Sequence, residues 1–138
     1  MEFKWSKGTS DFNDAAQIRQ EVFVREQGFE DEFDSDDKEA LHLLLYVSGQ
    51  AVATARLVKL TEEMYKIGRV AVLIEHRGKH YGEAVMGEAI KKAASLGACT
   101  VELGAQKHAE QFYVKLGFVS QEPYFEQGCA HVHMVMKI

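Results

Sequence analysis

A segment in the middle of the chain combines residues that could bind a phosphorylated ligand. Val70-Ala71-Val72 has the pattern of a buried strand, and a short connection carries Arg77 and Lys79 into a helical pattern that starts near Gly82. The first turn of a helix leaves backbone N–H groups unpaired at the positive end of its dipole. Glycine also lets the backbone approach a ligand closely. Together with the two cations, these features predict a diphosphate site.

The same segment has a simpler interpretation as a strand-to-helix connection whose glycines only satisfy turn geometry. It contains neither Gly-x-x-x-x-Gly-Lys-Ser/Thr nor Gly-x-Gly-x-x-Gly, so it matches no P-loop and no dinucleotide-binding fingerprint. Taken alone, the residues leave both interpretations open. The same holds for Phe112 and Tyr113 further along, which could be core aromatics of a short helix.

Two motifs in a fixed order resemble the GNAT superfamily of N-acetyltransferases. Their Gln/Arg-x-x-Gly-x-Gly/Ala signature corresponds to Arg77-Gly78-Lys79-His80-Tyr81-Gly82, with His80 at the place of the first signature glycine. Their Asn-x-x-Ala-x-x-Phe-Tyr-x-Lys-x-Gly-Phe segment corresponds to Gln106–Phe118, with Gln106 in place of asparagine. The match is clear over Ala51–Phe118. The flanking segments resemble small stand-alone bacterial members of the ElaA type.

The resemblance implies an acetyl-CoA co-substrate, an amine acceptor and direct attack on the thioester. It implies that Tyr113 hydrogen-bonds or protonates the departing thiolate, and that the backbone N–H of Val72 polarises the thioester carbonyl. The residues expected to contact the cofactor are Val70, Ala71, Val72, Arg77, Gly78, Lys79, His80, Tyr81, Gly82, Glu83 and Gln106.

The hydrophobic pattern along the chain predicts the elements that would position these residues. It indicates the order β α β β β α β α β β. The expected strands are Phe3–Trp5, Leu41–Val47, Ala51–Leu60, Tyr65–Leu73, Thr100–Leu103, Phe118–Ser120 and Ala130–Lys137, and the helices run from Ser10-Asp11 to Gly28, Gly82–Leu96 and Ala109–Leu116. We therefore expect one α/β domain over residues 1–138, with a GNAT-like mixed sheet of six to seven strands and helices on both faces.

The general base and the acceptor site are less clearly marked. A lysine-like amine has a pKa of about 10.4, so a base must remove a proton. The glutamate that several GNAT members use before the phosphate loop is absent, and Lys66, Gly68 and Arg69 occupy that region. We expect the base to be water-relayed, a histidine, or part of the acidic segment Glu26–Glu32. The candidate acceptor-site residues are Glu26, Gln27, Glu30, His131 and His133.

The acidic residues between Arg25 and Ala40 have two interpretations. The plainer one is a solvated loop, and the sharper one is a negative rim that attracts a cationic acceptor. The formal net charge of −5 argues against nonspecific nucleic-acid binding. Apolar runs are too short to span a membrane, and no secretory signal is expected.

The two cysteines suggest a reducing, cytoplasmic location, and we expect Cys99 to be buried core. No metal is expected, although His131 and His133, with His42 or a carboxylate, leave a metal-dependent binder as one alternative. An acyl-CoA-binding sensor or interaction module without turnover is another. The oligomeric state is open, with a homodimer among the options.

Overall fold

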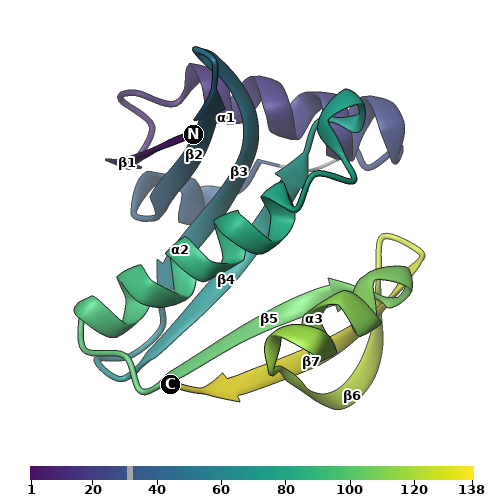
Figure 1. The fold of residues 1–138 in the computed structure, drawn as a ribbon. Coiled ribbons are helices and arrows are strands. Elements are labelled where there is room, and N and C mark those ends of the chain that lie inside the picture. Colours follow the sequence, from purple (N-terminus) through teal and green to yellow (C-terminus); the bar gives the residue numbers. More distant parts are fainter. Residues whose placement is uncertain (31–32) are drawn as a thin grey trace.

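The computed structural model describes residues 1–30 and 33–138, and its strands form one mixed sheet in the order β1-β2-β3-β4-β5-β7-β6 (Figure 1). Only β4 and β5 pair in parallel among the described residues, and every other neighbouring pair is antiparallel. The strands are β1 Glu2–Lys7, β2 Leu41–Val47, β3 Gln50–Lys59, β4 Met64–Val72, β5 Thr100–Gln106, β6 Val119–Glu126 and β7 Cys129–Lys137. The predicted mixed sheet of six to seven strands is confirmed, and the structure has seven.

Helices cover both faces of the sheet, as predicted (Figure 1). On one face lies α1 (Asn13–Arg19), which continues as a π-helix, η1 (Gln20–Glu26), and buries Ile18 and Val22 against β2 and β4. On the other face lie α2 (Tyr81–Ser95) and α3 (Glu110–Leu116), which bury Met86 and Tyr113 against β4 and β5. The remaining turns are the 3₁₀-helices η2 (Ser35–Lys38), η3 (Ile74–His76) and η4 (Lys107–Ala109).

The parallel pair β4–β5 comes apart partway along its length (Figure 1). In the described part of the chain, only Met64–Lys66 of β4 pairs with β5, and its partner segment is Thr100–Glu102. Beyond that point β4 stays paired with β3, and β5 stays paired with β7. A bulge also interrupts β4 at Arg69, whose φ of 50° is rare for a residue other than glycine. The sheet therefore opens between the C-terminal halves of its two central strands.

Three local predictions are wrong. The first helix begins at Asn13 and not at Ser10, with Phe12 as its N-cap. Cys99 is exposed, because it lies in the connection between α2 and β5 and not within the strand. The strand predicted to stop at Ser120 continues to Glu126. Its residues are all exposed, and a register shift accommodates Pro123, so no inside–outside alternation marks this edge strand.

Candidate functional site

A cavity of about 270 Å³ occupies the opening between β4 and β5. On β5, the side chains of Leu103 and Ala105 belong to the core under α2 and α3, whereas Gly104 and Gln106 alternate to the other face. The cavity is lined by Tyr113 from the α3 side and by Tyr124 and His131 from the outer strands. It therefore passes through the sheet from one face to the other. A thioester in it could meet different groups on each side.

Tyr113 lies on the α3 side of this cavity. Tyr113 is only 9% exposed, and its ring makes edge contacts with Phe112 and Phe118. Burial raises the pKa of Tyr113 to about 12, because the phenolate would lose its hydration. The side chain is thus a proton donor at neutral pH. Its motif predicts Tyr113 as a site residue, and the side chain lines this cavity.

On the opposite face, Tyr124 and His131 were not expected to act together. Their rings stack at 5.3 Å between centroids, and the Tyr124 hydroxyl lies against β5 at Gly104. A β-carbon at position 104 would lie 1.9 Å from that hydroxyl oxygen, so this contact requires glycine. Burial, with a smaller effect of Glu126, raises the pKa of Tyr124. The only signal in the sequence was a glycine inside a strand, which often marks such a close approach.

The predicted phosphate loop leads into the N-terminus of α2 and borders a separate hollow of about 230 Å³. His80 is the N-cap residue and has a left-handed backbone, with φ of 65° and ψ of 20°. This conformation explains why a glycine is usual at that signature position. Gly82 packs against Phe112, where a β-carbon would lie 3.3 Å from Cζ. Lys79 is exposed and has no partner among the residues described, so its charge is free for a ligand.

Arg77 is bound within the protein. Its two terminal nitrogens each lie 2.6 Å from a carboxylate oxygen of Glu26, and its Nε donates to the carbonyl of Val72 at 3.0 Å. The hydrogen bonds from Arg77 keep the pKa of Glu26 below its usual range. Two residues predicted for different roles, cofactor and acceptor, are thus brought together. Their ion pair ties the phosphate loop to η1.

Of the other predicted residues, Gln27 and Gln106 line the β4–β5 cavity, and Glu30 lines a neighbouring hollow with them. Gln106 donates to Gln27 at 2.7 Å, which links β5 to the end of η1. The backbone N–H of Glu30 donates to Gln127. His131 lines the cavity, but His133 does not. Asp31 and Glu32, which belong to the segment proposed to supply the base, lie outside the described residues.

Two of the acidic residues after Phe33 are paired with arginines within the protein. Asp37 is buried between Arg19 and Arg56, and Asp34 binds Arg56 and Arg69. Burial by itself would raise the pKa of Asp37, but hydrogen bonds and charge from the arginines lower it overall. The interpretation of these carboxylates as an attractant for cationic acceptors is therefore wrong for Asp34 and Asp37. Their role is to hold η2 against the sheet.

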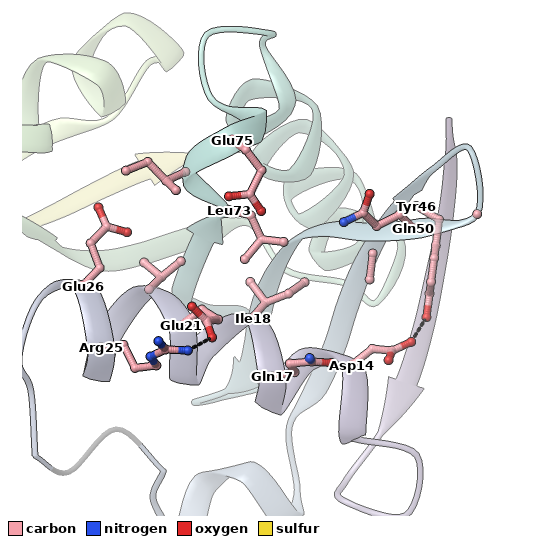
Figure 2. A pocket seen from close by; sticks show the side chains of 14 residues that line it. Asp14, Gln17, Ile18, Glu21, Arg25, Glu26, Tyr46, Gln50, Leu73 and Glu75 are labelled. Atoms are coloured by element: carbon pink, nitrogen blue, oxygen red, sulfur yellow. Dashed lines mark hydrogen bonds and ion pairs between the residues drawn. The ribbon is translucent and has the colours of Figure 1, made fainter.

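A larger groove of about 690 Å³ lies along α1 and η1 (Figure 2). Ile18 and Leu73 form part of its apolar floor, and Glu26 and Glu75 point toward it from its rim (Figure 2). Arg25 is paired with Glu21 within it. The groove shares no lining residue with the β4–β5 cavity. The groove is therefore separate from the candidate site between β4 and β5, although it is larger.

No group of three or more metal-binding side chains occurs among the residues described. Both ring nitrogens of His133 lie 3.1 Å from carboxylates, those of Glu122 and Glu102. His42 contacts the carbonyl of Asp37 at 3.0 Å. Within residues 1–30 and 33–138, no helix is long and apolar enough to cross a membrane.

Comparison with known proteins adds independent information. Residues 9–138 match the family model described as "Acetyltransferase (GNAT) domain". The chain is 32% identical to "Uncharacterized N-acetyltransferase YjcF" of Bacillus subtilis over 134 residues, which cover 94% of this chain and 95% of that protein. It is 33% identical to "Protein ElaA" of Escherichia coli over 136 residues, which cover 88% of this chain and 84% of that protein.

Solved structures show the same arrangement of strands and helices. The crystal structure of Escherichia coli ElaA superposes with a TM-score of 0.84 at 30% identity, covering 99% of this chain and 100% of that one. A GNAT family acetyltransferase from Elizabethkingia anophelis, solved with acetyl-CoA bound, superposes with a TM-score of 0.76 at 15% identity, covering 99% of this chain and 98% of that one. The second likeness concerns the fold alone.

Proposed function

The chain belongs to the GNAT acetyltransferase family, and we propose that it transfers the acetyl group of acetyl-CoA to a primary amine of a small molecule or peptide in the cytoplasm. The observation that carries this proposal is the cavity between β4 and β5, which opens to both faces of the sheet. An extended pantetheine arm fits a gap where two strands part, because the free strand edge offers backbone hydrogen bonds. An acceptor could then approach from the other face.

The cofactor would lie along β4 and end at α2. Val70, Ala71 and Val72 would pair with the pantetheine arm, and the diphosphate would meet the loop Arg77–Glu83 at the positive end of α2. Lys79, which has no partner within the described ranges, would offer its positive charge to the phosphates. Arg77 would act through its bonds to Glu26 and Val72, which fix the loop against η1 and β4. Membership of the GNAT family supports this cofactor, and the Elizabethkingia structure shows acetyl-CoA bound to a protein of similar fold.

The reaction would be a direct attack of the amine nitrogen on the thioester carbon. The N–H of Val72 would stabilise the oxyanion, and Tyr113 would give its proton to the departing thiolate. The raised pKa of about 12 suits a group that must hold its proton until sulfur leaves. Neither cysteine is needed for an acyl-enzyme, and neither Cys99 nor Cys129 lines the β4–β5 cavity.

The test is release of the coenzyme A thiol from acetyl-CoA with a panel of alkylamines, polyamines, aminoglycosides and peptides. We expect Tyr113→Phe to lower kcat about 10²-fold while coenzyme A still binds. The matched control is Tyr46→Phe, because Tyr46 bonds Asp14 in the separate groove. Tight coenzyme A binding with no thiol release for any amine would contradict the proposal and indicate a sensor module.

A further inference from the structure

We propose that His131 is the general base that takes the proton from the attacking amine, an inference that rests on the proposed acetyl transfer. His131 is 6% exposed and lines the β4–β5 cavity. It lies on β7 opposite Gln106 of β5, at the end where the central strands have parted. His131 therefore lies on the face of the sheet opposite to Tyr113. The acceptor would enter from this His131 face.

The hydrogen bonds of His131 fix which ring nitrogen is free. Its Nδ1 lies 2.9 Å from the backbone carbonyl oxygen of Cys129. A carbonyl oxygen only accepts, so Nδ1 carries the hydrogen and donates it. In the neutral ring, Nε2 then holds a lone pair and can accept a proton. The same hydrogen bond to the backbone also holds the ring in one orientation, which a histidine acting as a general base requires.

The other ring nitrogen, Nε2, makes no hydrogen bond within residues 1–30 and 33–138. The carboxylate of Glu126 lies 3.8 Å from Nε2 through Oε2, beyond hydrogen-bond distance. The titratable groups in contact with the ring are Tyr124 and Glu126 from β6. Across β5 its neighbour is the uncharged Gln106.

The other histidines nearby are less suited to this role. His133 lies two residues along the same strand, but both its ring nitrogens face the carboxylates of Glu102 and Glu122, and it does not line the cavity. His108 lines the cavity but is exposed on η4 and has no hydrogen-bond partner within the described ranges to orient it. Among the histidines that the structure describes, only His131 both lines the cavity and has a ring oriented by one hydrogen bond with its other nitrogen unbonded.

The proton balance then closes. Nε2 of His131 accepts one proton from the acceptor ammonium, and the freed lone pair of the amine forms the C–N bond. When the adduct collapses, the C–S bond breaks and its electron pair leaves with sulfur, which takes the proton of Tyr113. The second proton lost by the attacking nitrogen returns to the tyrosinate through solvent. Ammonium and acetyl-CoA yield an amide, the coenzyme A thiol and one proton, which His131 releases to water.

The experiment compares His131→Asn with the matched control His133→Asn, using the alkylamine of the panel that the wild-type protein acetylates fastest. Each variant is first titrated with coenzyme A alone to show an intact cofactor site. We expect His131→Asn to lower kcat/KM for the amine at pH 7 by about 10²-fold or more, with little change in the KM for acetyl-CoA. His133→Asn should stay within about threefold of wild type, because His133 does not line the cavity and contacts only the carboxylates of Glu102 and Glu122.

The pH profile separates a base from a structural role. Without a base the reaction depends on the free amine, so the rate of His131→Asn should rise about tenfold per pH unit toward the amine pKa, near 10.4 for a lysine-like amine. Wild type should instead reach a plateau, and added imidazole should partly restore the variant. A variant with the wild-type rate and profile would overturn the assignment and leave acetyl transfer intact. Failure of wild type with every amine would instead overturn the proposed function.

Discussion

Gly104 offers a sharp test of the geometry on the acceptor side of the cavity. In Gly104→Ala the new methyl carbon would lie 1.9 Å from the Tyr124 hydroxyl oxygen, whereas ordinary contacts begin at 3.4 Å. The tyrosine hydroxyl must therefore move by about 1.5 Å, which also disturbs its stack on His131. Overpacking costs about 1–3 kcal/mol. Because Tyr124 is 36% exposed and can swing outward, we expect about 1 kcal/mol.

Removal of the hydroxyl should rescue the substitution. In Tyr124→Phe the nearest ring atom, Cζ, is 3.2 Å from the added carbon, so a shift of a few tenths of an ångström suffices. The alanine should then be nearly neutral, because alanine also restricts the unfolded chain more than glycine does. The double-mutant cycle should give a coupling of about 1 kcal/mol.

The measurement is urea unfolding of wild type, both single variants and the double variant, compared at constant m-value. Gly68→Ala on the adjacent strand is the control, since no atom lies within 4 Å of its added carbon. Additivity of the two substitutions within about 0.5 kcal/mol would refute the proposed contact between Tyr124 and β5.

Three further changes probe the phosphate loop and the buried charges. His80→Gly should raise the free energy of unfolding by up to about 1 kcal/mol, measured by thermal or urea unfolding. A residue with a side chain costs about 1–2 kcal/mol in the left-handed conformation of position 80, and the greater flexibility of glycine in the unfolded chain offsets part of this gain. A clear loss of stability would contradict this. Glu26→Gln should weaken acetyl-CoA binding a few-fold by calorimetry with little change in kcat, since it loosens Arg77; tighter binding would mean that Arg77 itself moves to the phosphates. The lowered pKa of Asp37 gives stability that is present above its ordinary value of 3.8 and is lost as pH falls through the lower folded-state pKa. Urea midpoints between pH 5 and 2.5 should show this loss for wild type and not for the less stable Asp37→Asn, and equal acid slopes would contradict it.

The sequence predicts the interior of the fold well, because buried strands and helices carry a strong hydrophobic period. Leu41–Val47 and the helix after Gly82 are clear for this reason. The edge is harder to predict. Strand β6 is exposed on every residue, so no burial pattern marks its second half. Cys99 shows the same limit, since one residue decides whether it belongs to a connection or to the buried strand.

The candidate site divides in a similar way. Motif spacing finds the loop before α2 and Tyr113, because these residues are close in sequence to the elements that hold them. The partners of Arg77 and His131 cannot be predicted in this way, because they depend on which strands and turns meet in space. Glu26 lies 51 positions from Arg77, and the contact of Tyr124 with Gly104 follows from a register between separate strands. Such contacts leave no pattern in a single sequence.

The most direct test of acetyl transfer is a coupled measurement on the wild-type protein with the amine panel. Coenzyme A thiol release is recorded while mass spectrometry follows acetylation of each amine. We predict that at least one amine accelerates thiol release and gains one acetyl group on nitrogen for each thiol formed. Thiol release that no amine accelerates above the rate in water alone, with coenzyme A bound, would contradict the central claim.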